Sequence, residues 1–153
     1  MKGISFLRMN KGDFSIRQAS WQQDRIALRR IRDIVFVQEQ QVPRELEWDQ
    51  QDATAIHFLA EDDNGNPIGT ARLLRSGQIG RMAVLKEFRG NGVGARLLAA
   101  VIEQAVKAGY EQVFLHAQVS VIGFYERSGF VAEGQRFMDA GIEHQAMRLV
   151  LQG

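Results

Sequence analysis

The run KEFRGNGVG at residues 86–94 constrains the fold more than any other feature of this sequence. It places Gly90, Gly92 and Gly94 between a segment with strand character and one with helix character. Glycine has no Cβ, so consecutive backbone N–H groups can approach a ligand closely, and a helix N-terminus adds unpaired donors and partial positive charge. Arg89 adds a cation at the rim. The run therefore predicts a strand, loop and helix unit whose loop can hold a phosphate.

Length and composition exclude several classes of protein. The chain of 153 residues can bury one core and contains no cysteine for a disulfide, a thiol nucleophile or a thiolate metal site. Its 19 basic and 18 acidic residues give a net charge of +1, so we expect no nucleic-acid partner. Three histidines far apart predict no metal site. We expect one domain over residues 1–153, with residues 1–12 as a flexible N-terminal segment.

Targeting signals are not evident in the sequence. No apolar stretch approaches the ~18 residues that a membrane span needs, and the first residues lack the pattern of a signal peptide. We therefore expect no membrane partner and a cytoplasmic location.

Apolar periodicity divides the chain into alternating strands and helices. Strands are predicted at 13–19, 56–61, 67–75, 78–84, 112–117 and 142–151, with another beginning at Phe130. Helices are predicted from Ser20 to about Gln41, from the glycine run to Gly109, and over a short segment capped by Ser120. The order β-α-β-β-β-α-β-α-β-β predicts an α/β fold with an antiparallel first half and one crossover around the central helix.

Two polar segments are expected to lie at the surface. Residues 43–55 are acidic, aromatic and without a regular period, which predicts an irregular segment. Within the first predicted helix, the cluster Arg25, Arg29, Arg30 and Arg32 is expected to be a solvated face.

The glycine run alone leaves alternatives open. A tight turn without a ligand is compatible with it. A Walker loop is excluded because no Lys-Ser or Lys-Thr follows the last glycine. A dinucleotide-binding fingerprint fits poorly, because the glycine spacing differs and the strand that ends at Ala117 and Gln118 carries no acid for a ribose hydroxyl.

Together with its surroundings, the run resembles the GNAT superfamily of acetyl-CoA-dependent N-acetyltransferases over almost the whole chain. The segments that carry the resemblance are residues 82–84, 89–94, 118, 124–126 and 128–130. Arg89, Gly92 and Gly94 fill the core motif. Residues 36–43, 47–49, 57–60 and 116–118 resemble a bacterial subgroup of small acetyltransferases. The resemblance implies a mixed sheet of about six to seven strands with about four helices, an antiparallel N-terminal meander and a splayed strand pair.

The resemblance also implies acetyl-CoA as the acyl donor. Backbone N–H groups at the glycine run would bind the CoA pyrophosphate, and the preceding strand would pair with the pantetheine arm, with the Val84 N–H near the acyl carbonyl. Gln118 stands where many relatives place Asn, which puts its contact with pantetheine in question. The implied cofactor-binding residues are Met82, Ala83, Val84, Arg89, Gly90, Asn91, Gly92, Val93, Gly94, Ala95, Gln118 and Phe124.

Tyr125 is the first catalytic candidate, because the family places a Tyr there that donates to the departing CoA sulfur. The alternative is that Tyr125 only packs the core. A general base is also needed, because an amine with a pKa near 10.4 is neutral in only about 1 of 2,500 molecules at pH 7, a handicap of ~4.6 kcal/mol. The candidates for this base are Glu39, Glu47, Asp49, His57 and His116.

Several of these residues have structural alternatives. A strand histidine is more often a satisfied structural residue, and the same caution applies to His144. The acidic residues Glu39, Glu45, Glu47, Asp49 and Asp52 could recognise a cationic amine or form solvated surface. Trp48 either anchors its segment or lines a binding surface.

The expected function is transfer of acetyl from acetyl-CoA to a primary amine of a small molecule or peptide by direct attack. The acceptor is not identified by the sequence, and a homodimer is expected because many relatives form one. The alternatives are a non-catalytic sensor of acyl-CoA and, more distantly, a nucleotide-binding interaction domain.

Overall fold

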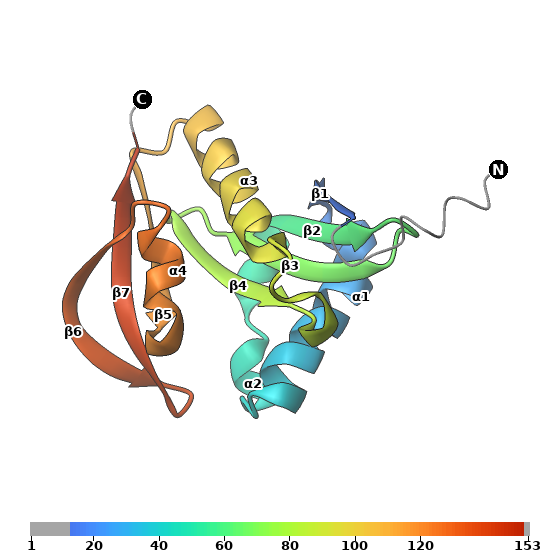
Figure 1. The fold of residues 1–153 in the computed structure, drawn as a ribbon, viewed down its shortest axis with the longest axis horizontal. Coiled ribbons are helices and arrows are strands. Elements are labelled where there is room, and N and C mark those ends of the chain that lie inside the picture. The colour runs from blue at the N-terminus through green and yellow to red at the C-terminus, as the bar shows by residue number, and fades with distance from the viewer. Residues whose placement is uncertain (1–12, 152–153) are drawn as a thin grey trace.

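The computed structural model describes residues 13–151, so the expected flexible segment 1–12 lies outside the described residues. A seven-stranded sheet has the order β1-β2-β3-β4-β5-β7-β6 (Figure 1). The strands are β1 (Phe14–Ala19), β2 (Ile56–Asp62), β3 (Pro67–Leu73), β4 (Gln78–Val84), β5 (Gln112–Gln118), β6 (Val131–Asp139) and β7 (Ile142–Val150). The α-helices are α1 (Trp21–Arg32), α2 (Arg44–Glu47), α3 (Val93–Lys107) and α4 (Ile122–Glu126). The predicted fold class is confirmed.

The sheet consists of two antiparallel halves joined by one short parallel contact. Strands β1 to β4 form the predicted meander, and β5, β7 and β6 form the second half. Between β4 and β5 only Gln78 and Ile79 are paired, with Phe114 and Leu115 respectively. Beyond Ile79 the two strands diverge, which is the splayed pair that the resemblance implies.

A bulge in β4 accompanies this divergence. The β3–β4 register shifts between Thr70 and Arg72, and Arg81 adopts a left-handed backbone with φ 50°. Bulges bend a strand and increase its twist, so β4 turns away from β5 at the point where pairing stops.

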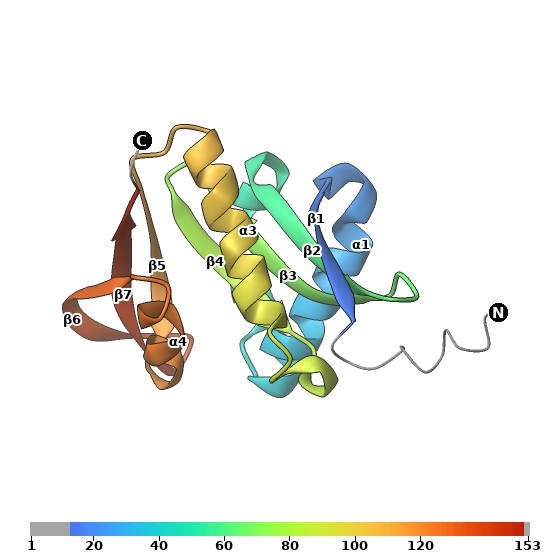
Figure 2. The ribbon, with the colours of Figure 1, turned by 45° about the horizontal axis from the view of Figure 1, so that its top comes forward.

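Helices cover the first half of the sheet on both faces, with α3 on one side and α1 on the other (Figure 2). The α3 side buries Leu97 and Val101 with Phe58 of β2, whereas the α1 side buries Ile31 with Leu59 of the same strand. Phe58 and Leu59 are adjacent, so they point to opposite faces of the sheet.

The first helix begins and ends close to its predicted limits. The Ser20 hydroxyl accepts from the Gln23 N–H at 3.4 Å. The Asp24 carboxylate in turn accepts from the Ser20 N–H at 2.9 Å. After α1 the helix widens into a π-helical segment, Asp33–Glu39, and it stops before Gln41, which has φ 62°. π-helical turns are frequent at functional sites, and this one covers the divergence of β4 and β5.

Two local predictions are wrong. Residues 43–55 contain α2 and a 3₁₀ turn, Gln50–Thr54, which the Asp49 carboxylate caps by accepting from the Gln51 N–H at 3.1 Å. Ser120 does not cap α4, because it lies inside a 3₁₀ turn and the cap position is Val121, which makes no side-chain capping bond. Within residues 13–151, no helix is long and apolar enough to cross a membrane.

The α3 helix approaches β3 so closely that Gly69 leaves almost no room for a side chain. A Cβ there would lie 3.1 Å from Leu97 Cδ1 and 3.2 Å from the Ala83 carbonyl oxygen. We expect Gly69→Ala to lower the free energy of unfolding by about 1–3 kcal/mol through overpacking. Gly80→Ala in β4 is the matched control, because a Cβ there meets nothing within 4 Å. Thermal or urea unfolding of both variants tests this, and equal stabilities would contradict the close approach.

Candidate active site

A cavity of about 980 Å³ opens where β4 and β5 diverge. Its walls come from both halves of the sheet, the glycine run, α4, the π-helical segment with α2, and the turn between β6 and β7. We call the π-helical segment and α2 together the roof. The predicted site residues that line the cavity are Met82, Ala83, Val84, Arg89, Gly90, Gly92, Val93, Gly94, Ala95, His116, Gln118, Phe124 and Tyr125. Glu39, Asn91 and His57 are not among its lining residues.

The glycine run forms a turn that delivers the start of α3 to the cavity wall. Gly90 and Gly92 have φ of 82° and 86°, a backbone conformation that residues with a side chain rarely adopt. Gly92 is the N-cap of α3, so the free N–H groups of a 15-residue helix begin there. Asn91 donates to the carbonyl oxygens of Phe88 and Arg89 at 3.2 and 3.3 Å, and thus holds the shape of the loop from within.

Arg89 ties this loop to two other elements. Its Nε donates to the Val84 carbonyl oxygen at 2.9 Å, and its two Nη atoms donate to the Glu39 carboxylate at 2.6 and 2.7 Å. The bond from Arg89 lowers the pKa of Glu39, and the bond to Glu39 raises the pKa of Arg89. Glu39 is therefore a paired carboxylate at the cavity rim, with its charge compensated.

Tyr125 reaches across the divergence from α4 to β4. Its ring packs edge-on against Phe124 and Phe130, with centroids 5.0 and 6.0 Å apart, and its hydroxyl lies 3.9 Å from Met82 Sδ. Burial raises the pKa of Tyr125 to about 12, so the hydroxyl stays protonated at neutral pH. A thioether is a weak acceptor, so this donor remains available to a stronger one.

Beneath the roof lies a network of buried and partly buried ion pairs. Arg32, 1% exposed, donates to Glu47 at 2.5 Å and to Asp52 at 2.9 Å. Arg72 donates to Asp52 and to Asp49, both at 2.9 Å. Arg81 at the β4 bulge donates to Glu47 at 3.2 Å and to Asp49 at 3.1 Å. Three arginines and three carboxylates thus join α1, the roof, β3 and β4.

This network changes the expectation for the polar residues. The prediction of a solvated face is wrong for Arg32, which shares the buried stripe of Leu28 and Val35, four and three residues away respectively. Glu47, Asp49 and Asp52 are each paired with arginine, and Glu39 is paired with Arg89.

Trp48 is 45% exposed and does not line the cavity. The Arg29 guanidinium lies 5.2 Å from the Trp48 ring centroid and 5.1 Å from that of Trp21, so Trp48 contacts α1 from its segment.

The three histidines have different surroundings. His57 is 1% exposed, stacks on Trp21 with ring centroids 4.9 Å apart, and has Nε2 2.8 Å from the Asp52 carbonyl oxygen. Burial lowers the pKa of His57, which lies beneath α1 and away from the cavity. His116 lines the cavity from β5 and is exposed. His144 of β7, which was not selected from the sequence, also lines the cavity.

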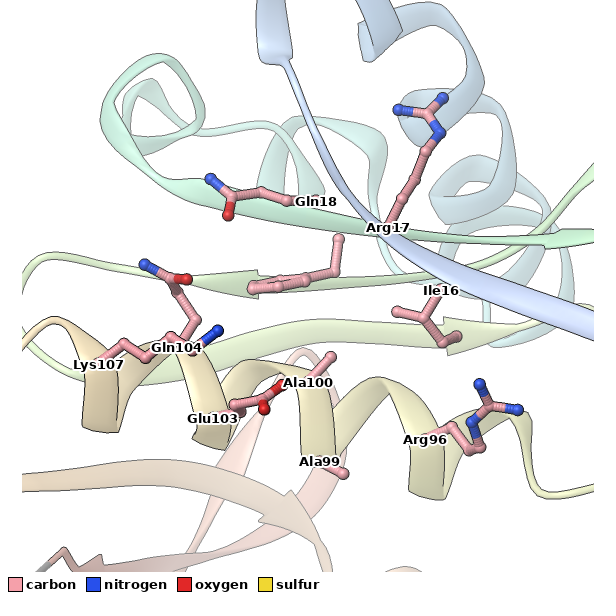
Figure 3. Close-up of a pocket in the computed structure, with 10 residues that line it drawn as sticks. Ile16, Arg17, Gln18, Arg96, Ala99, Ala100, Glu103, Gln104 and Lys107 are labelled. Carbon is pink, nitrogen blue, oxygen red and sulfur yellow. The ribbon is translucent and has the colours of Figure 1, made fainter.

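A second hollow of about 590 Å³ lies between β1 and α3 (Figure 3). Ile16 and Gln18 of β1 face Arg96, Glu103 and Lys107 of α3 across it. It contains none of the predicted site residues, so the candidate site is the cavity between β4 and β5.

Comparison with known proteins agrees with this geometry. The profile of a family described as acetyltransferase (GNAT) domain matches residues 27–151. The uncharacterized N-acetyltransferase YjcF of Bacillus subtilis is 35% identical over 121 residues, which cover 76% of this chain and 86% of that protein. An acyl-CoA N-acyltransferase structure from Pseudomonas aeruginosa is 30% identical, with a TM-score of 0.77 over 89% of this chain and 97% of that one. Escherichia coli ElaA is 26% identical, with a TM-score of 0.79 over 88% and 98%.

The chain belongs to the GNAT family of acetyltransferases. Acyl-CoA is the donor of this fold's N-acyltransferases, and acetyl transfer to an amine is the general reaction of the family. The alternative function, a nucleotide-binding interaction domain, is therefore not favoured.

Asp52 tests whether the network holds the roof. Burial would raise its pKa, but the hydrogen bonds and charges of Arg32 and Arg72 outweigh burial and lower it. A lowered pKa means that this carboxylate stabilises the fold above the pKa of an unfolded Asp, about 3.9, and that the contribution is lost as pH falls below that value. We expect Asp52→Asn to lower the free energy of unfolding by about 3–5 kcal/mol at pH 7, and by less at lower pH.

Chemical denaturation between pH 3 and 7 measures this difference. Glu133→Gln is the control, because Glu133 and its partner Arg148 are 48% and 46% exposed in their side chains. An Asp52→Asn variant as stable as the control at pH 7 would contradict the proposed role of the network.

Proposed function

We propose that this protein transfers acetyl from acetyl-CoA to a primary amine of a small molecule or peptide by direct attack. One observation carries the proposal: the divergence of β4 from β5 opens a single cavity that joins the glycine run, the free edge of β4 and Tyr125. Each of these elements matches one part of the donor: the pyrophosphate, the pantetheine arm and the sulfur.

The donor would bind along the α3 side of the cavity. The N-terminus of α3 with Gly90 and Gly92 supports pyrophosphate binding, because backbone N–H groups and the helix dipole favour an anion there. Beyond Ile79 the edge of β4 that faces β5 has no strand partner, which supports pairing with the amide groups of pantetheine as an added strand would pair. The Val84 N–H is proposed as the donor to the acyl oxygen.

In the reaction, the amine nitrogen attacks the thioester carbon and the C–S bond breaks with its electron pair on sulfur. A backbone donor at the acyl oxygen would stabilise the tetrahedral intermediate by about 3–4 kcal/mol. Tyr125 would donate a hydrogen bond to the leaving sulfur. With a pKa of about 12 for Tyr125, complete proton transfer to a thiolate of pKa about 8.5 would cost ~5 kcal/mol, so we assign Tyr125 the role of hydrogen-bond donor.

The roof favours an acceptor with an apolar part. Phe36 and Leu46 of the roof and the neighbouring Val42 line the cavity. Of the carboxylates expected to recognise a cation, Glu39, Glu47, Asp49 and Asp52 are paired with arginines, and Glu45 does not line the cavity. Apolar contact under the roof would then hold part of the acceptor, and Asp139 is a lining carboxylate without an arginine partner among the described residues.

Exposed Val131, Met138 and Val150 on β6 and β7 support a homodimer, which stays a prediction.

Tyr125→Phe tests the assignment of the leaving-group donor. We expect the rate of thiol release at saturating acetyl-CoA, with an amine found by library screening, to fall several-fold or more, because the sulfur loses its hydrogen bond. The dissociation constant of acetyl-CoA should change little. The control is Tyr110→Phe, since Tyr110 is the other of the two tyrosines and does not line the cavity.

Two outcomes would contradict the proposal. A near-zero rate in wild type and variant alike, with acetyl-CoA bound, would favour a non-catalytic sensor. Tighter binding of ATP than of acetyl-CoA in calorimetric titrations would favour a nucleotide-binding domain.

Glu39→Gln separates two roles for the carboxylate at the rim. In the free protein Glu39 is paired with the guanidinium of Arg89, which would face the pyrophosphate. Removing the charge of Glu39 should therefore tighten acetyl-CoA binding by about two- to fivefold, the range expected for an exposed ion pair. Calorimetry measures this affinity, and steady-state kinetics should show little change in kcat. A large loss of kcat with unchanged affinity would instead identify Glu39 as the general base.

A further inference from the structure

His144 lines the cavity from β7. In the β5–β7 ladder it pairs directly with Gln118, so both side chains point to the same face of the sheet. Gln118 donates to Gln40 of the roof side at 2.9 Å, which identifies that face as the one under the roof. Tyr125, by contrast, packs against the core under α3. The two side chains thus border the same cavity from opposite faces of the sheet.

A backbone contact determines the protonation of the His144 ring. Nδ1 lies 2.7 Å from the carbonyl oxygen of Ile142, which can only accept a hydrogen bond. Nδ1 therefore carries the proton, and in the neutral ring Nε2 holds a free lone pair. Within residues 13–151 no protein group hydrogen-bonds to Nε2.

Packing fixes the orientation of the same ring. His144 is 9% exposed and stacks on Phe137, its partner in the β6–β7 ladder, with centroids 5.8 Å apart and planes at 22°. His116 contacts the same Phe137 ring edge-on at 5.1 Å. A ring that is held by packing and by a hydrogen bond at one nitrogen presents the other nitrogen in one direction, as a positioned base requires.

The other candidates for the base lack this combination. Glu39, Glu47 and Asp49 are paired with arginines, and His57 lies outside the cavity. Asp139 lines the cavity, but it is exposed and makes no orienting side-chain hydrogen bond among the described residues. His116 lines the cavity, but it is exposed and makes no orienting hydrogen bond among the described residues. Besides Tyr125 and His144, the charged or titratable side chains that line the cavity are Glu47, Arg81, Arg89, His116, Arg127 and Asp139.

We propose that His144 is the general base of the reaction, with Nε2 accepting the proton of the acceptor amine directly or through one water. The inference rests on the proposed function. The amine nitrogen forms the C–N bond and gives its proton to Nε2, while the C–S bond breaks and its electron pair stays on sulfur beside Tyr125. The proton then passes from Nε2 to solvent at the cavity mouth. Base and leaving-group donor would act from different walls of the same cavity, the base on the amine nitrogen and Tyr125 on the sulfur.

His144→Asn is the informative variant. An Asn amide can still donate to the Ile142 carbonyl oxygen from the Nδ1 position, but it offers no lone pair at the Nε2 position. With 2-phenylethylamine as the probe amine, we expect kcat/KM to fall about 100-fold at pH 7, with the affinity for acetyl-CoA and the melting temperature nearly unchanged. His144→Gln, which loses the bond to Ile142, should be no more active.

The pH profile distinguishes a base from a structural residue. Both the neutral amine and a neutral base are needed in wild type, so log kcat/KM should rise with slope two at the acid end of the profile and with slope one where only the amine titrates. In His144→Asn only the amine titrates, and the slope should be one throughout. A slope of two that persists in His144→Asn would overturn the proposal. Loss of the slope-two part of the profile in His116→Asn, and not in His144→Asn, would also overturn it.

The tautomer of His144 can be measured without enzymatic activity. Multiple-bond ¹H–¹⁵N spectra of protein labelled at histidine, assigned with the His144→Asn variant, should show His144 protonated at Nδ1 and unprotonated at Nε2. A proton on Nε2 at neutral pH would overturn the proposal. This test holds even if the wild-type protein does not acetylate 2-phenylethylamine. A wild type that binds no acetyl-CoA would instead contradict the proposed function, so the two failures are distinguishable.

Discussion

The loss of pairing between β4 and β5 is the constraint on which the site depends. Two parallel residue pairs join the halves of the sheet, and the strands then separate. Unpaired edges expose N–H and C=O groups that favour another strand, so this gap is a binding surface for an extended ligand as well as a space. The left-handed Arg81 and the shift of register bend β4 away, which makes the gap part of the fold.

The ion-pair network holds the roof above this gap. Its arginines come from α1, β3 and β4, and its carboxylates come from the roof and the turn that follows it. Burying charges is rarely more stabilising than an apolar core, but each of the four buried charges here has a partner of opposite sign. We interpret the network as a means of positioning the roof. Arg81 at the bulge contacts Glu47 of α2, so the bend in β4 and the position of the roof are coupled.

The sequence predicted what depends on local period and turn chemistry. The strands of the meander, the helix after the glycine run and the cap at Ser20 follow from spacing over a few residues. The choice of partners between distant segments does not. Glu39 and Arg89 are 50 residues apart, and nothing in either segment indicates that one neutralises the other. Arg32 is an intermediate case, since its place on the stripe of Leu28 could have shown that it is buried but not with what.

The glycine run shows how a turn and a binding loop can be told apart by position. Gly90 and Gly92 have positive φ, so the turn alone accounts for them. Gly94 does not, and a Cβ there would lie 3.5 Å from Phe124 and 3.9 Å from Val84, which is ordinary contact. Neither backbone conformation nor packing therefore demands glycine at this position. The remaining physical reason is the close approach of a ligand to the first turn of α3, between Phe124 and the open edge of β4.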